Sequence, residues 1–262
     1  MLGTILRCLR LVSERFPPII ERIQLILSQD YFTMKTDTYL KKLYANRFDS
    51  RQMQAKVALW KVLIDDFLQN YVPSDSAILD IGGGYCEFIN QIRAEKKCLI
   101  DLNPDSKLLA NPDVKVLNID VLSFGDKPAF SEEFDRIFIS NFFEHLRNKE
   151  ELIQIISFCF EALKPGGSLL VVQPNFKYSF KEYYDFIDHQ LPITHLSLQE
   201  LLQTVGFEID LIIPRFLPFS TKGRPASPWL LKVYLKLPFL WLFLGGQMFV
   251  KASKKNNRGR AS

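Results

Sequence analysis

The sequence lacks several features that would assign it to a familiar class of protein. Its four cysteines (Cys8, Cys86, Cys98 and Cys159) show neither paired spacing nor a metal-type Cys-x-x-Cys motif, which predicts a reduced, cytoplasmic protein. No run of residues approaches the roughly 18 uncharged apolar positions of a membrane span. Charged residues interrupt the apolar N-terminus throughout, so no secretion signal is predicted.

A strong charge of one sign is also missing. The chain has 33 Lys and Arg against 29 Asp and Glu, a net charge of +4. Nucleic-acid binding needs clustered Lys and Arg, so no nucleic-acid partner is predicted. Part of the basic excess lies in residues 254–262, which we expect to form a flexible, solvated tail.

The apolar content of 47% is enough for one large α/β domain, which we place at residues 46–253. Residues 1–45 predict an amphipathic helical arm, broken around Pro17 and Pro18. A further helix is predicted over Arg51–Asn70. Its apolar residues Met53, Val57, Trp60, Ile64 and Phe67 recur every three or four positions.

From Ala77 onward, short apolar runs alternate with helical stretches, which is typical of a parallel sheet built from βαβ units. A helix is predicted over Glu150–Leu163, with a stop and turn at Lys164–Gly167. Ser197 and Glu200 predict a capping box for a helix that ends at Gly206. The predicted strands are Ala77–Ile81, Lys97–Asp101, Val114–Leu117, Phe134–Ser140, Ser168–Gln173, Phe207–Ile213 and Gly246–Ala252.

A glycine-rich turn, Gly82–Gly84, leads from the first predicted strand into an expected helix. Glycines let backbone N–H groups approach a ligand without a Cβ in between. The dinucleotide fingerprint needs a further glycine where this chain has Glu87, and no Gly-Lys-Ser/Thr sequence of a P-loop follows. The turn therefore favours a ligand without a pyrophosphate.

One acidic residue stands at or after each of the first three predicted strands: Asp80, Asp101 and Asp120. Asp101 lies about 20 residues beyond the glycines, the distance at which a carboxylate meets ribose hydroxyls in a doubly wound sheet. Three carboxylates at strand ends suit a ligand with an amino group, a ribose and an adenine. The alternative is that each carboxylate caps the next helix or turn.

Four motifs in order, over roughly residues 75–175, resemble those of class I S-adenosylmethionine (SAM)-dependent methyltransferases. They are Leu79–Gly84, Ile100–Pro104, Asn118–Val121 and Leu163–Gly167. The resemblance implies a Rossmann-like fold with a mostly parallel seven-stranded sheet, helices on both faces, and SAM as cofactor. It implies that Asp80, Gly82, Gly83 and Gly84 hold the methionine part, Asp101 the ribose, and Asp120 with Val121 the adenine. Ile81 and Leu102 are the other implied cofactor contacts.

One position departs from the family pattern. The family usually continues with a third glycine where this chain has Cys86. A cysteine is small enough to begin the expected helix, so cofactor binding is expected to survive.

The segment Ser140–Leu146 follows the fourth predicted strand, and in class I methyltransferases this segment faces the sulfonium and the acceptor. The resemblance thus adds Asn141 to the cofactor contacts and makes Glu144 and His145 catalytic candidates. A histidine can accept the proton released when a hydroxyl is methylated. His145 is our first choice of base and His189 the second. The alternative is that His145 only starts or caps a helix.

The connection after the fifth predicted strand is unusually aromatic and polar. Loops at the carboxyl ends of strands bind substrates in doubly wound folds. We therefore predict acceptor contacts from Asn175, Tyr178, Asp188 and His195, although a packed lid would explain the aromatic residues equally well. The spacing of Asp188, His189 and His195 matches no standard metal motif, so no metal site is predicted.

The second half of the chain resembles a subgroup of these methyltransferases found with bacterial polysaccharide and glycolipid synthesis. The similarity spans roughly residues 40–253 and implies a sugar or glycolipid hydroxyl as acceptor. The segments that carry it are Tyr44–Phe48, Ser140–Leu146, Gln173–Asn175, Asp188–Leu196, Arg215–Phe219 and Gly246–Gln247.

Residues 219–245 predict an apolar helical insertion before the last strand. In Trp229–Leu244, Lys232 and Lys236 share one helical face beside amphipathic rings, and Pro238 breaks the helix. This composition suits a helix lying on the inner face of the cytoplasmic membrane. A dimer contact, or packing against the N-terminal helices, explains the same pattern.

The sequence thus predicts SAM-dependent methylation of a small hydroxylated acceptor, such as a sugar or glycolipid. A non-catalytic SAM-binding or partner-binding protein of the same fold is the main alternative. A nucleic-acid methyltransferase is disfavoured because no Asn-Pro-Pro-aromatic motif follows the fourth predicted strand.

Overall fold

The computed structural model describes residues 50–124, 130–220 and 227–256, with side chains from residue 54 onward. Backbone contacts divide the chain into residues 1–54 and 55–262, and the fold below is that of the second unit. The predicted arm at 1–45 and the end of the predicted tail lie outside the described residues.

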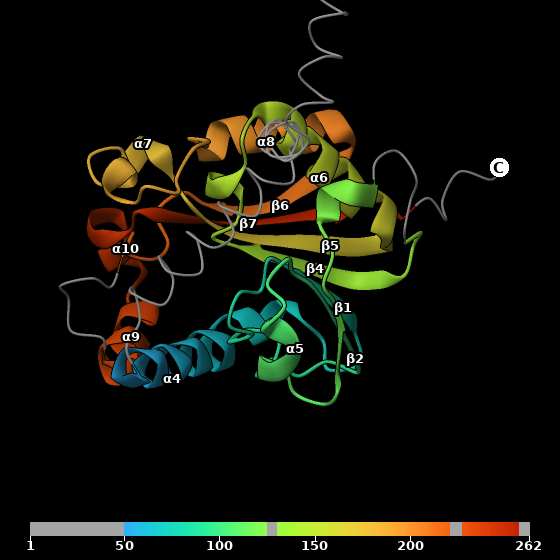
Figure 1. Ribbon diagram of the computed structural model, residues 1–262. Coiled ribbons are helices and arrows are strands. Elements are labelled where there is room, and N and C mark those ends of the chain that lie inside the picture. The colour runs from blue at the N-terminus through green and yellow to red at the C-terminus, as the bar shows by residue number, and fades with distance from the viewer. Residues whose placement is uncertain (1–49, 125–129, 221–226, 257–262) are drawn as a thin grey trace, which may run out of the picture. The chain divides into compact units, whose positions relative to one another are not determined.

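A seven-stranded sheet forms the centre of this unit (Figure 1). Its order is β3-β2-β1-β4-β5-β7-β6, and every neighbouring pair is parallel except the two that involve β7. The mostly parallel sheet is therefore confirmed. The strands are β1 Ala77–Ile81, β2 Lys96–Ile100, β3 Val114–Leu117, β4 Phe134–Ser140, β5 Leu163–Pro174, β6 Phe207–Ile213 and β7 Gln247–Lys254.

Helices cover both faces of the sheet. Figure 1 shows α6 (Lys149–Ala162) and α8 (His195–Val205) on one face, and α4 (Ser50–Asp66) and α5 (Ser106–Leu109) on the other. Each face has its own apolar core: Ile155 and Leu198 belong to one, Ile64 and Phe138 to the other. The remaining helices are η1 Leu68–Tyr71, η2 Val121–Phe124, η3 Phe143–His145, α7 Phe176–Ser179, η4 Tyr183–Asp185, α9 Pro228–Leu235 and α10 Pro238–Leu244.

The strand order places a topological switch point between the carboxyl ends of β1 and β4, and we call this place the crevice. The chain moves outward from β1 to β2 and β3, then crosses back to β4. The loops that follow β1 and β4 therefore leave the sheet in opposite directions. In open α/β sheets, ligands bind at this kind of topological switch point.

The segment after the glycine turn differs from the prediction. A helix was expected there, but residues 84–91 form consecutive turns with only scattered helical bonds, such as Asn90 N to Cys86 O at 3.1 Å. Side-chain packing, and not a regular series of helical hydrogen bonds, holds the segment in place. Phe88 is buried and stacks on Phe138 with ring centroids 3.8 Å apart. Burial of this ring stabilises the segment by about 1.5–3 kcal/mol.

Two other boundaries were predicted wrongly. Lys164–Gly167 is not a turn but part of β5, because Leu163 pairs with Phe134 and a register shift follows. The capping box of α8 is formed by Thr194 and Ser197, not by Ser197 and Glu200, since the Thr194 side chain accepts from Ser197 N and Ser197 accepts from Thr194 N.

The structure also describes most of the predicted apolar insertion and the start of the predicted tail. The helices α9 and α10 lie between β6 and β7, and no helix of the described ranges is long and apolar enough to cross a membrane. Lys254, which was assigned to the flexible tail, is the last residue of β7 and donates to Leu163 O at 2.9 Å. Lys255 pairs with Glu208 at 2.7 Å.

Candidate functional site

The glycine turn lies at the carboxyl end of β1, and each glycine is needed for a different reason. A Cβ on Gly82 would collide with the Phe142 ring, and one on Gly83 would lie 2.7 Å from Asp80 Oδ2. A Cβ on Gly84 would meet nothing within 4 Å, but its φ of +56° favours glycine. Gly84 thus presents bare backbone to open space, where a ligand can approach.

Asp101 joins the loops that follow β1 and β2. One carboxylate oxygen accepts from Gly84 N and the other from Asn103 N, both at 2.7 Å. Burial raises the pKa of Asp101, and the two amide bonds oppose that rise. The Asn118 side chain, just after β3, donates to the Asp101 and Asn103 carbonyls at 3.2 and 2.8 Å, so the ends of three strands are fixed together.

Asp80 is the last but one residue of β1, and its side chain is only 2% exposed. Its Oδ2 has no hydrogen-bond partner among the described residues. Burial, together with the nearby charges of Asp101 and Glu87, holds the pKa of Asp80 well above its usual value. A buried carboxylate without a partner, beside bare glycine backbone, fits a ligand that carries an amino group.

Glu87 occupies the position where the dinucleotide fingerprint needs a glycine. Its side chain is buried and pairs with Lys56 of α4 at 2.9 Å. Lys56 also lies 5.5 Å from the centroid of the Tyr85 ring. Sequence reasoning did not anticipate this ion pair, because the two residues are 31 positions apart and no local pattern connects them.

Asp120, Val121, Ile81 and Leu102 are the remaining predicted cofactor contacts at or after the ends of the first three strands. Asp120 Oδ1 accepts from Leu122 N at 2.9 Å and so caps η2, which is the alternative considered for this residue. Val121 and Ile81 are buried and contribute apolar side chains to the core. Leu102, directly after Asp101, is 67% exposed and offers apolar surface beside the crevice.

The start of the loop after β4 is held against the glycine turn. Asn141 has a φ of +48° and donates its backbone N–H to Val172 O at 2.9 Å. The Phe142 ring that follows lies against Gly82. The structure therefore brings Asn141 to the same crevice as the glycine turn.

Glu144 is almost fully buried behind the crevice. Gln173 of β5 donates its side-chain amide to Glu144 Oε2, and its Oε1 accepts from Phe142 N and Phe143 N at 3.3 Å each. Burial raises the pKa of Glu144, whereas His145 and the Gln173 hydrogen bond oppose the rise. Gln173 was not predicted as a site residue. Its sole sequence signal was a polar residue in an apolar strand.

His145 and His189 come together although 44 positions separate them. His145 Nδ1 lies 3.1 Å from the Asp188 carbonyl and 3.5 Å from Asp188 Oδ2. The two imidazole centroids are 5.4 Å apart. Ligand-type atoms of Glu144, His145 and His189 all lie within 4.8 Å of one another, and we call these three residues the histidine–glutamate cluster.

Asn175 and His195 pair with each other rather than facing the cluster. Asn175 is fully buried and donates to His195 Nδ1 at 2.9 Å and to Pro214 O at 2.7 Å. Burial, with Lys177 nearby, lowers the pKa of His195. The partly exposed Tyr178 ring stacks on His195, with Arg215 5.0 Å from its centroid. These contacts favour a positioning role for Asn175 and His195.

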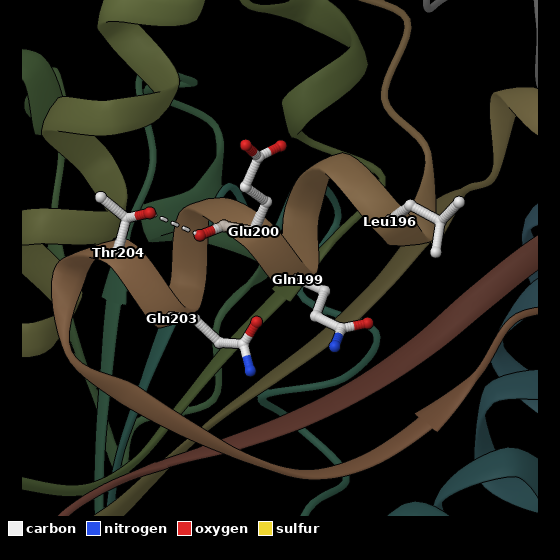
Figure 2. Close-up of a pocket in the computed structure, with 5 residues that line it drawn as sticks. All are labelled: Leu196, Gln199, Glu200, Gln203 and Thr204. Atoms are coloured by element: carbon white, nitrogen blue, oxygen red, sulfur yellow. Dashed lines mark hydrogen bonds between the residues drawn. The ribbon is translucent and has the colours of Figure 1, made fainter.

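A separate hollow lies on the outer side of α8. Figure 2 shows its lining, in which Thr204 Oγ1 donates to the Glu200 carbonyl at 2.7 Å. All five lining residues come from this one helix, and Glu200 is the single ionisable group among them. The hollow therefore has no histidine beside its carboxylate, unlike the histidine–glutamate cluster.

Comparison with known proteins shows the family and the fold of the chain. A family model described as a methyltransferase domain matches residues 50–212. A SAM-dependent methyltransferase from Archaeoglobus fulgidus has a similar structure, with 21% identity, 82% of this chain and 99% of that chain covered, and a TM-score of 0.57. A comparison with curated proteins finds no match.

Two further structures show how broadly the fold is used. A SAM-dependent methyltransferase from Mesorhizobium loti is 16% identical, covers 71% of this chain and 95% of its own, and has a TM-score of 0.52. The 4+2 cyclase SpnF is also 16% identical, with 72% and 80% covered and a TM-score of 0.51. Identities this low establish the fold alone, but the family match spans more than half of the chain. The chain therefore belongs to the methyltransferase-domain family, with S-adenosylmethionine as its cofactor.

Proposed function

We propose that the protein methylates a hydroxyl oxygen of a sugar, a glycolipid or another small hydroxylated acceptor. The pairing of His145 with Asp188 is the observation that carries this proposal. A hydrogen on Nδ1 donated to Asp188 leaves the lone pair of His145 on Nε2. A partly exposed imidazole held in one tautomer is what a general base requires.

S-adenosylmethionine supplies an electrophilic methyl carbon on a sulfonium sulfur. We assign its amino group to Asp80, because a cationic partner stabilises the ionised form of a carboxylate whose pKa burial has raised. Gly82–Gly84 admit the ligand to the backbone, and Asp101 lies where ribose hydroxyls would be bound. The remaining proposed contacts are Ile81, Leu102, Asp120, Val121 and Asn141.

The residues of the cluster have distinct proposed roles in the transfer. The acceptor oxygen forms a bond to the methyl carbon as the carbon–sulfur bond breaks, and the hydroxyl proton passes to His145 Nε2. Such a base contributes about 100- to 10,000-fold to the rate. His189 is the second candidate base. Glu144 lies buried beside His145 in η3 and is the third catalytic candidate.

The surroundings of His189 suit a sugar-like acceptor. The rings of Tyr183, Phe186 and Phe219 lie around His189, with centroids 4.9, 5.0 and 6.1 Å away. Binding sites for small molecules combine such aromatic walls with a few polar groups. Tyr178 and Asp188 are the proposed direct contacts, and Asn175 and His195 support them from behind.

Peripheral contact with a membrane is a further part of the proposal. Residues 211–262 contain ten of the 33 Lys and Arg and none of the 29 Asp and Glu. In the same region α9 and α10 expose large apolar side chains, including Trp229 (69%) and Phe243 (73%). Exposed rings beside basic residues suit an anionic lipid surface and hence a glycolipid acceptor.

The exposed helices are connected to the acceptor side of the crevice. Arg215 donates to the Phe243 and Gly245 carbonyls at 2.9 and 3.0 Å, and its guanidinium lies over the Tyr178 ring. An acceptor held at a lipid surface would thus be presented near Tyr178. The matched test is sedimentation with phosphatidylglycerol vesicles. The double variant Trp229→Ser/Phe243→Ser should lose binding, whereas Leu108→Ser, at an exposed apolar residue of α5, should keep it.

The alternative is that the protein binds S-adenosylmethionine without catalysing a reaction, or that it catalyses a different reaction. The structural similarity to a cyclase supports considering this alternative. We would incubate the protein with radiolabelled S-adenosylmethionine and bacterial glycolipid and polysaccharide fractions. Label should enter one fraction, and His145→Asn should reduce the rate by about 100-fold with cofactor affinity little changed. Cofactor binding without transfer to any fraction would favour the alternative.

A further inference from the structure

We propose that the histidine–glutamate cluster binds a divalent transition-metal ion. Three ligand-type atoms, one each from Glu144, His145 and His189, lie within 4.8 Å of one another. Two of these residues belong to η3, and the third comes from the loop that precedes α8. The sequence spacing matches no metal motif because the loop closes onto η3 only in the folded chain.

The side chains of the cluster are held as metal ligands usually are. A histidine that binds a metal generally donates its other ring N–H to a carboxylate or a backbone carbonyl, and His145 Nδ1 lies against both of these groups on Asp188. Gln173 fixes Glu144, and is fixed in turn by two backbone amides. The loop is fastened by Gln190 N, which donates to Glu144 O at 2.7 Å.

The charge balance of the cluster also favours a cation. Glu144 is 2% exposed, and the Asp188 carboxylate beside it is also buried. Among the described residues, no Lys or Arg forms an ion pair with Glu144, and the ion pair beside it joins His145 Nδ1 to Asp188 Oδ2 at 3.5 Å. Burying a carboxylate without a cationic partner is costly, so a divalent ion would stabilise this arrangement.

The donor set indicates the kind of ion. Two imidazoles and one carboxylate suit Zn²⁺, Co²⁺, Fe²⁺ or Mn²⁺ better than Mg²⁺, which prefers oxygen ligands. Three protein ligands leave a coordination position open, as in catalytic zinc sites. Glu144 closes the buried side, whereas His145 and His189 are partly exposed, so the open position would lie on the partly exposed side.

Only the catalytic role of the metal ion rests on the proposed function. His145 Nε2 serves as a base in the metal-free protein and as a ligand in the loaded protein. In the loaded protein the ion would polarise the acceptor hydroxyl, and its proton would pass to water. Binding itself is independent of methyl transfer and is measured without an acceptor.

The test is titration of chelator-treated, full-length protein with Co²⁺, followed by visible absorption, and with Zn²⁺ by calorimetry. We expect one ion per chain, and affinity reduced about 100-fold or more in Glu144→Gln and in His189→Asn. The matched control is His195→Gln, because His195 is the chain's third histidine and pairs with Asn175 outside the cluster. This variant should bind Co²⁺ like the wild type.

Binding of S-adenosylmethionine, measured on each variant, confirms that the protein is folded. The metal proposal is overturned if folded wild-type protein binds no ion, or if His195→Gln loses binding as much as His189→Asn does. Methyl transfer by protein that binds no ion would remove the metal site and keep the proposed function. Ion binding without methyl transfer to any fraction would keep the metal site and remove the proposed function.

Discussion

The two sides of the crevice are built in different ways. On the proposed cofactor side, Asp80 lies at the end of β1, Gly82–Gly84 follow β1, and Asp101 follows β2 and accepts from backbone amides. On the acceptor side, Glu144, Gln173 and the Asp188–His189 pair come from distant segments, and side chains contact side chains. The positions of the residues on the cofactor side are therefore determined by the sheet. Those on the acceptor side depend on how the loop that carries Asp188 and His189 packs, and on the charged side chains of that side.

The largest expected effect tests the cofactor side alone. Asp101→Ala removes the hydrogen bonds to Gly84 N and Asn103 N, and bonds to a charged group are worth about 1.5–3 kcal/mol each. We expect the affinity for S-adenosylmethionine to fall about 100-fold in calorimetric titration. Asp113→Ala, which removes an exposed carboxylate paired with Lys97, should leave the affinity unchanged, and an equal loss there would contradict a specific role for Asp101.

The next largest effect should separate the two sides. Gln173→Leu leaves buried Glu144 without its amide partner and frees the amides of Phe142 and Phe143. An unsatisfied buried group costs about 1–3 kcal/mol, so we expect methyl transfer to fall about 30-fold while cofactor affinity changes less than about threefold. A parallel loss of affinity would show that the two sides are not independent.

A smaller effect concerns stability and pH. Asp80 has a pKa raised by burial, Asp101 and Glu87, so the folded protein binds its proton more tightly than the unfolded chain does. The stabilisation is present below the unfolded pKa of about 3.9 and is lost as the pH rises through the folded value.

Asp80→Asn removes this dependence. Without ligand, the variant should gain about 1 kcal/mol relative to the wild type near neutral pH, a rise in Tm of about 2–4 °C, and the difference should shrink towards pH 4. Thermal unfolding at both pH values measures this, and a difference that grows towards low pH would reverse the sign and refute the assignment. The variant should also bind S-adenosylmethionine more weakly.

The smallest effect is at the residue that departs from the family pattern. Cys86 has a φ of +65°, a conformation that costs a side-chain-bearing residue about 1–2 kcal/mol. Its side chain is also fully buried, with Sγ 3.7 Å from Ser106 O. In Cys86→Gly the relieved strain and the lost burial should nearly cancel, so Tm should change little.

The matched control for Cys86 lies in the sheet. Cys98→Gly, in the middle of β2, should lower Tm by several degrees, because glycine weakens a buried strand and leaves a cavity. Equal losses in the two variants would show that the backbone at Cys86 is not strained.

How far the sequence predicted each side follows from the range of its contacts. The strand-end carboxylates and the glycine turn could be located because their spacing is set by neighbouring βαβ units. The helix expected after Gly84 was wrong, because local pattern does not reveal the positive φ of Cys86 or the packing of Phe88 on Phe138. The contact between His145 and Asp188 could not be predicted, because the two residues are 43 positions apart and no local sequence pattern connects them.

The most direct test of the central claim is calorimetric titration of the wild-type protein with S-adenosylmethionine, with NAD as the control ligand. A preformed cofactor side predicts saturable binding of one S-adenosylmethionine per chain, with a dissociation constant of the order of micromolar, and no heat with NAD. A well-folded sample that binds neither ligand, or that binds NAD equally well, would contradict the cofactor site described for Asp80, Gly82–Gly84 and Asp101.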